Sequence, residues 1–174
     1  MASSYPEFVI AVRILLALVF AAAALSKFRH LTTFEGVVAN YRLLPQWFVK
    51  PFSYALPILE SALCIALLAG IRYSGLAAEA LLCLFALAMG INILRGRTYI
   101  DCGCFSSVLK QSLRWSLVIR NLLLAILAAF AGPALVETTP LSAVFGVLGG
   151  LAAFLVVQSF NVILSMPARR RRPA

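Results

Sequence analysis

The sequence predicts an all-α membrane protein, a polytopic bundle of transmembrane helices, and three observations carry that prediction. Hydrophobic residues make up 63% of the 174-residue chain, charged residues make up 12%, and the mean hydropathy is +0.98, whereas a soluble domain is roughly half apolar. Five apolar segments approach the length of about 20 residues that a helix needs to cross a bilayer. The two-residue alternation of a membrane β-barrel is absent, so helices are left to satisfy the backbone hydrogen bonds inside the membrane.

The predicted spans lie near residues 8–28, 52–70, 74–94, 116–136 and 141–165. They form a single domain over residues 1–168, with a four-helix core and a fifth helix, followed by a basic cytoplasmic tail at 169–174. No basic residue precedes the first span, and Lys27 and Arg29 stand at its end. This charge pattern is typical of a retained helix rather than of a cleaved signal peptide.

The distribution of basic residues predicts the orientation in a bacterial inner membrane. Twelve lysines and arginines fall on the side of the first and third connections and the tail, against Arg72 alone on the other side. By the positive-inside rule, the N-terminus lies outside, and the loop at 95–115 and the C-terminus lie in the cytoplasm. Those twelve residues are Lys27, Arg29, Arg42, Lys50, Arg95, Arg97, Lys110, Arg114 and Arg169–Arg172.

Four ionisable residues fall inside the predicted spans: Arg13, Glu60, Glu79 and Arg120. Each charge costs about 2.5–3.5 kcal/mol at the centre of an inserted helix, so we expect partners. At about 1.5 Å of rise per residue, Arg13 lies close enough in depth to reach Glu79, Glu60 or both. Arg120 can snorkel to the cytoplasmic surface or meet Asp101. These residues either carry function or fix the register of the bundle.

Two further features concern helix geometry. Pro57 removes a backbone hydrogen bond three residues before Glu60, and a kink there opens space beside the carboxylate. Gly146 and Gly150 form a small-residue face on the last span that favours close helix packing. Neither feature predicts a specific dimer.

The central polar stretch "RGRTYIDCGCFSS" contains Cys102 and Cys104, separated by Gly103, which permits a tight turn. Two basic residues on each side, Arg95 and Arg97 before the pair and Lys110 and Arg114 after it, favour a thiolate, whereas Asp101 opposes it. A disulfide between residues two apart is strained and therefore exchangeable. We therefore predict a redox pair at Cys102 and Cys104.

Two other interpretations of this loop stay open. Zinc has a candidate ligand set in Cys102, Cys104, Asp101 and His30, although the spacing matches no recognised finger. The two loop cysteines can also have no chemistry at all. Cys64 and Cys83, by contrast, lie among leucines and alanines and are expected to be small hydrophobic side chains, although a second thiol pair inside the membrane is not excluded. We predict no metal site.

The net charge of +9 does not indicate a nucleic-acid partner. The basic residues flank apolar segments, and neither a glycine-rich phosphate loop nor a basic face with interleaved aromatic residues is present. The lipid bilayer is the partner that the composition predicts.

The residues also carry a family resemblance. The runs "RILLALVFAAAALSKF", "NYRLLP" and "LPILESALCIALLAG" resemble the membrane core of the DoxX-like superfamily, in which residues equivalent to Arg13, Lys27 and Glu60 recur. The run "INILRGRTYIDCGCF", followed by "LRWSLVIRNLLLA", resembles the MauE branch, over about residues 8–135. Members of that branch often continue with Phe-Gly after the second cysteine, whereas this chain has Phe105 and then Ser106.

The resemblance implies a membrane accessory protein of methylamine utilisation. Such a protein would act with a thioredoxin-like, MauD-type partner in maturing the small subunit of a periplasmic amine dehydrogenase, by thiol–disulfide exchange. If it is an enzyme, it is a thiol–disulfide oxidoreductase. The main alternative is a non-catalytic scaffold that recruits or stabilises the redox partner; a transporter-like bundle is disfavoured because no inverted repeat is visible.

Two expectations follow for a redox protein of this kind. A polar pocket beside the helix that carries Pro57 can hold a quinone or a second relay. A cytoplasmic thiol pair with a periplasmic client further requires electrons to cross the membrane, through Cys64 and Cys83 for instance, or a loop that dips into the bundle, or the opposite orientation.

Overall fold

The computed structural model describes residues 6–100, 113–131 and 139–165, and these residues contain six helices and no strand. The helices are α1 (Pro6–Arg29), α2 (Leu31–Tyr41), α3 (Gln46–Leu68), α4 (Ser74–Leu94), α5 (Trp115–Phe130) and α6 (Pro140–Ser165). The all-α prediction is confirmed. Four of them, α1, α3, α4 and α6, are long and apolar enough to cross a membrane, which supports a multi-pass membrane protein.

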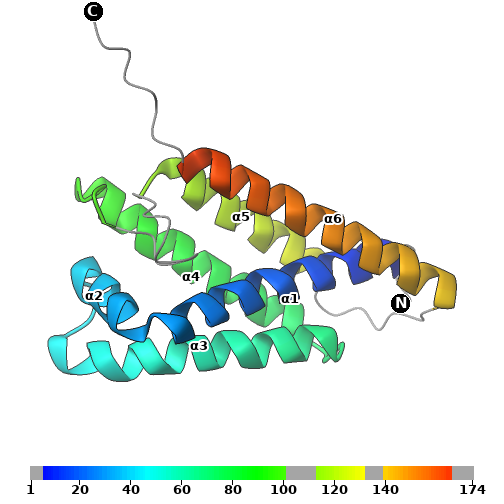
Figure 1. Cartoon of the computed structure of the whole chain (residues 1–174), viewed down its shortest axis with the longest axis horizontal. Helices are drawn as coiled ribbons and strands as arrows, with labels where there is room; N and C mark the ends of the chain where they lie inside the picture. Colours follow the sequence, from blue (N-terminus) through cyan, green and yellow to red (C-terminus); the bar gives the residue numbers. More distant parts are fainter. Residues whose placement is uncertain (1–5, 101–112, 132–138, 166–174) are drawn as a thin grey trace, which may run out of the picture.

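Helix α1 lies at the centre of the bundle (Figure 1). It packs along α6 on one side and α3 on the other, while α4 packs mainly against α5. Leu16, Ala17 and Phe20 in its middle are at most 1% exposed. The burial explains why this helix carries so few polar residues between its two ends: it faces protein in most directions.

The packing of α6 on α1 depends on glycine and fixes their relative direction. A Cβ at Gly146 would lie 2.6 Å from the Cβ of Ile10, and a Cβ at Gly150 would lie 2.7 Å from the carbonyl oxygen of Ala11. The small-residue face predicted on the last span is therefore a close-packing surface within the chain. Because higher numbers on α6 meet higher numbers on α1, the two helices are parallel.

Parallel α1 and α6 support the five predicted crossings. With α1, α3, α4, α5 and α6 crossing in turn, the first and fifth point the same way, whereas four crossings would make α1 and α6 antiparallel. Helix α5 has 16 residues, or about 24 Å at 1.5 Å per residue, somewhat less than the roughly 30 Å hydrocarbon core. The rest of its predicted span, beyond Ala131, lies outside the described residues.

The connection expected at 29–51 differs from the prediction. It contains the helix α2, and α3 begins at Gln46. Phe34 and Val38, one turn apart, are the buried face of α2 and pack on the core formed by α1, α3, α4 and α5. Two buried residues among eleven give a hydrophobic periodicity that is too weak to identify a helix from the sequence alone.

Candidate functional site: an apolar cavity beside a buried ion pair

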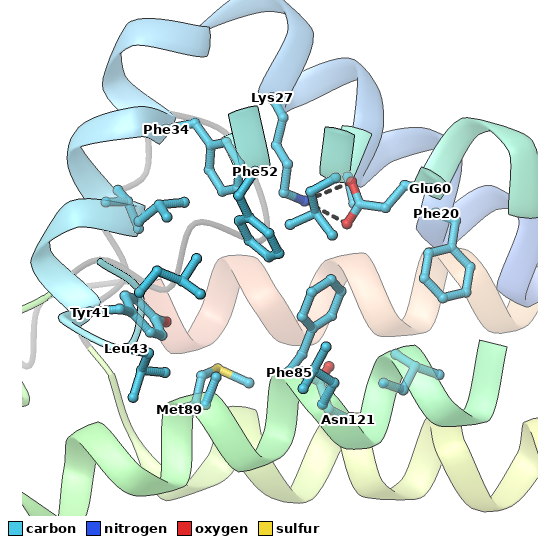
Figure 2. Close-up of a pocket in the computed structure, with 18 of the residues that line it drawn as sticks. Phe20, Lys27, Phe34, Tyr41, Leu43, Phe52, Glu60, Phe85, Met89 and Asn121 are labelled. Carbon is cyan, nitrogen blue, oxygen red and sulfur yellow. Dashed lines mark hydrogen bonds and ion pairs between the residues drawn. The ribbon is translucent and has the colours of Figure 1, made fainter. Parts of the chain in front are cut away.

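An apolar cavity of about 280 Å³ lies between α1, α2, α3, α4 and α5. Aromatic and aliphatic side chains form most of its wall, and α2 with the short connection to α3 covers one end. Figure 2 shows Lys27 and Glu60 on one side of the cavity and Asn121 on the other, with Phe85 between them in this view. The few polar groups of the cavity are therefore contributed by α1, α3 and α5, together with the Tyr41 hydroxyl of α2.

Lys27 and Glu60 form a buried ion pair. The Lys27 ammonium donates to both carboxylate oxygens of Glu60, with Nζ–Oε1 at 2.7 Å and Nζ–Oε2 at 2.9 Å. The two side chains are 4% and 0% exposed. Removing one partner of such a pair leaves a buried charge uncompensated, which typically costs about 3–5 kcal/mol. The pair therefore locks α1 to α3 at the wall of the cavity.

Two aromatic rings surround the Lys27 ammonium on its other sides. Its Nζ lies 5.4 Å from the centre of the Phe34 ring and 5.8 Å from that of Phe85. Both distances are within the range of cation–π attraction. Phe34 belongs to α2 and Phe85 to α4, so one ammonium group connects α1 with α2, α3 and α4.

A second polar cluster lies at the α5 side. Arg120 donates to the Asn161 side chain over 2.6 Å and to that of Asn121 over 3.3 Å. Arg120 and Asn121 line the cavity, and Asn161 is on α6. Arg120 is 8% exposed, so in the structure its guanidinium ties α5 to α6 rather than reaching outward. Sequence analysis missed both asparagines; an amide in an apolar helix was the available signal.

The structure places the other predicted polar residues as follows. Arg13 lies near the C-terminal end of α3. A Cβ on Gly70, just after that end, would lie 3.3 Å from Nη1 of Arg13. Glu79 is partly buried on α4. The partner that the structure gives Glu60 is Lys27, which sequence analysis used for orientation and for the family pattern but not as an ion-pair partner. Bridging from Arg13 to Glu79, Glu60 or both stays a prediction.

The predicted redox residues Cys102, Gly103 and Cys104 lie outside the described residues, as does Asp101. The two residues that flank this segment are buried in the bundle. Ile100 and Leu113 are 5% and 1% exposed, and the Leu113 amide donates to the Ile100 carbonyl over 3.1 Å. Both belong to an apolar cluster with Met89, which also lines the cavity. The residues on either side of the segment that carries the thiols thus lie together beside the cavity.

The two cysteines within helices are free thiols. Cys64 is partly buried and packs on the core, and Cys83 is on the outer surface of α4. Among the residues that the structure describes, no three His, Cys, Asp or Glu side chains gather as a metal site would require. The zinc alternative at the loop rests mainly on residues outside that part of the chain.

Comparison with known proteins identifies the family. The model of the family "Methylamine utilisation protein MauE" matches residues 5–134. The chain belongs to the MauE family. The matched range contains the cavity-lining helices α1 to α5 and the segment with Cys102 and Cys104. As expected from the sequence, the last helix is the less distinctive part, since α6 lies beyond the matched range.

Several curated MauE proteins are similar over most of their length. The chain is 44% identical to methylamine utilization protein MauE of Paracoccus denitrificans, over 91% of this chain and 88% of the relative. It is 44% identical to that of Methylorubrum extorquens over 82% and 77%, and 36% identical to that of Methylophilus methylotrophus over 90% and 85%. No solved structure matches the chain.

Proposed function

We propose that this MauE protein is a membrane accessory factor of methylamine utilisation that acts by thiol–disulfide exchange at Cys102 and Cys104. Its partner is a thioredoxin-like protein, and its client is the disulfide-containing small subunit of a periplasmic amine dehydrogenase. The methylamine role is drawn from the names of the MauE relatives. The chemistry is drawn from the Cys-Gly-Cys sequence within the matched range.

The observation that carries the proposal is the anchoring of the thiol segment. Ile100 and Leu113 are buried in the bundle and hydrogen-bonded to each other, so the two residues on either side of the stretch with Cys102 and Cys104 are fixed close together. Exchange between two proteins requires a thiol pair held at a defined place with access to a partner. A short segment pinned at both ends fits this requirement.

The exchange conserves electrons and atoms. A thiolate of the Cys102 and Cys104 pair attacks a disulfide sulfur of the partner, forming a mixed disulfide and releasing one partner thiolate. The second cysteine then attacks the mixed disulfide, so that the pair ends as a disulfide and the partner as a dithiol, or the reverse when the pair begins oxidised. Gly103 between them supplies the backbone freedom for the small ring.

Serine substitution tests the proposal. We expect Cys102→Ser and Cys104→Ser, singly or together, to abolish maturation of the client, and we expect one single variant to accumulate a mixed disulfide that non-reducing electrophoresis detects. The matched control is Cys64→Ser with Cys83→Ser, which removes the two other thiols and leaves maturation intact. Normal maturation with the Cys102 and Cys104 double variant would refute exchange and favour the scaffold function.

We further propose that the N-terminus lies outside and the thiol segment lies on the cytoplasmic side of the inner membrane. The asymmetry of twelve basic residues against one supports this orientation. In intact cells of a strain carrying Cys64→Ser and Cys83→Ser, a membrane-impermeant maleimide should leave the reduced pair unlabelled until the cells are lysed. Labelling before lysis would reverse the orientation.

A further inference from the structure

Lys27 and Glu60 neutralise each other at the cavity wall, because the ammonium is paired with both carboxylate oxygens. Arg120 donates to the side-chain oxygens of Asn161 and Asn121, which carry no charge. Most of the wall is apolar, so a charged ligand entering this space would lose its own hydration without regaining it from the lining. The cavity therefore favours an uncharged molecule.

One buried donor in the cavity wall has no hydrogen-bond partner. Asn121 is 2% exposed and lines the cavity; its Oδ1 accepts from Arg120, while its Nδ2 is buried without a partner. A buried amide hydrogen without an acceptor destabilises the folded protein. A ligand with an oxygen acceptor would remove that cost.

A second donor is available on the opposite wall. The Lys27 ammonium has three N–H groups, and two of them are directed at the oxygens of Glu60. The third lies beside the Phe34 and Phe85 rings, whose centres are 5.4 and 5.8 Å from Nζ, so a ligand oxygen would reach it between these two rings. Lys27 belongs to α1 and Asn121 to α5, and Figure 2 shows them on different sides of the space. The pattern suits a molecule with one acceptor oxygen at each end.

The walls between the two donors suit a flat ring. Phe34, Phe52, Phe85 and Tyr41 come from three different helices and line the cavity, and aromatic side chains stack well on flat ligands. A cavity of about 150 Å³ is enough to bind benzene, and this one measures about 280 Å³. It accommodates a single substituted ring. A lipid acyl chain would leave both donors unsatisfied.

We propose that this cavity binds the head group of a membrane quinone, with one carbonyl accepting from Asn121 Nδ2 and the other from Lys27 Nζ. A quinone is uncharged, flat, soluble in the bilayer and carries two carbonyl oxygens on opposite sides of its ring. The proposal deepens the proposed function by naming an electron acceptor, and that redox part rests on it. Oxidising two thiols to a disulfide releases two electrons and two protons, which convert one quinone to its quinol.

Binding is measured with decylubiquinone, a short-tailed quinone, by calorimetric titration of the purified full chain in detergent micelles against protein-free micelles. We expect saturable binding at one site per chain. Asn121→Leu, which removes the donor but keeps the shape, should weaken binding about tenfold, the effect of one lost hydrogen bond. The matched control is Asn92→Leu, because Asn92 is also a buried amide but is not part of the cavity wall.

A second variant keeps the test decisive if Asn121→Leu does not fold. Ala88→Phe fills the cavity from α4 and should abolish binding without changing a polar group. Absence of saturable binding by the wild type, or wild-type affinity in Ala88→Phe, would overturn the proposal. So would a co-purified phospholipid, detected by native mass spectrometry, that decylubiquinone fails to displace.

The quinone site and the thiol chemistry fail separately. The Cys102→Ser and Cys104→Ser double variant should bind decylubiquinone as the wild type does, because it leaves the proposed donors Lys27 and Asn121 unchanged. Unimpaired maturation by this variant would refute the proposed function while leaving the binding result intact. If the wild type shows no saturable binding while the double variant still loses maturation, the quinone site alone is refuted.

Discussion

Replacing Glu60 with glutamine or leucine, or Lys27 with methionine, should destabilise the protein strongly, whereas replacing both with apolar residues should restore stability. The ion pair is bidentate, with Nζ–O distances of 2.7 and 2.9 Å, and both side chains are buried. Each single variant leaves one charge in the bundle without its counterion. The double variant Lys27→Met with Glu60→Leu removes both charges and fills the space with side chains of similar volume.

The magnitude follows from this geometry. Breaking a buried pair costs about 3–5 kcal/mol, while exchanging it for apolar residues is neutral or stabilising by about 1–4 kcal/mol. Glu60→Gln should fall at the lower end, because the remaining ammonium keeps the Phe34 and Phe85 rings at 5.4 and 5.8 Å, and a desolvated cation–π contact contributes about 2 kcal/mol. At about 2–4 °C per kcal/mol for a chain of this size, single variants should lower Tm by roughly 6–20 °C.

The assay is thermal unfolding of the purified protein in detergent, followed by circular dichroism at 222 nm. Glu7→Gln is the matched control, because Glu7 is exposed in the first turn of α1 and its charge contributes at most about 1 kcal/mol through the helix dipole. Single variants as stable as Glu7→Gln would refute the reasoning. A double variant whose loss equals the sum of the two single losses would refute it equally, since the charges would then not be coupled.

Two further predictions concern the helices that hold the cavity in place. Gly150→Ala places a Cβ 2.7 Å from the carbonyl oxygen of Ala11 and should cost about 1–3 kcal/mol, whereas Gly149→Ala meets only an ordinary contact at 3.5 Å and should be tolerated. Equal Tm values for the two variants would contradict the close packing of α6 on α1 at Gly150. Arg120→Leu removes the charge-assisted hydrogen bond from α5 to Asn161 on α6 and should cost about 1.5–3 kcal/mol, while Arg114→Leu on the exposed surface should change stability by no more than about 0.5 kcal/mol. Limited proteolysis and Tm compare these two variants.

Much of the fold could be predicted because the bilayer demands long apolar helices. The third predicted span, 74–94, coincides with α4 (Ser74–Leu94), and the first and fifth differ from α1 and α6 by at most two residues at either end. The start of α3 was predicted six residues late. Lys50 and Pro51 resembled a boundary, whereas the helix begins at Gln46 and includes Pro51. Polar residues and proline mark the end of an apolar stretch in the sequence. The helix itself can extend beyond the membrane surface, so its end does not coincide with the end of that stretch.

The candidate site was only partly predictable. Glu60 and Arg120 were identified because charges in apolar helices need partners, and both line the cavity. Their observed partners, Lys27 and Asn161, could not be deduced. Lys27 and Glu60 are 33 positions apart in the sequence, and Arg120 and Asn161 are 41 positions apart. The depth of a residue along its helix does not say which face of that helix meets which neighbour.

The sequence by itself determined the all-helical membrane architecture, the family, and the position of the Cys102 and Cys104 pair between two spans. These follow from composition, hydrophobic length and a local motif, which are properties of contiguous residues. Only the tertiary structure decided that Lys27 neutralises Glu60, that α2 covers a cavity, and that Asn121 presents an unpartnered donor to it. The physical reason is that these features depend on how the helices are rotated and which helices are neighbours, and both are set by packing over the whole bundle rather than by any single segment.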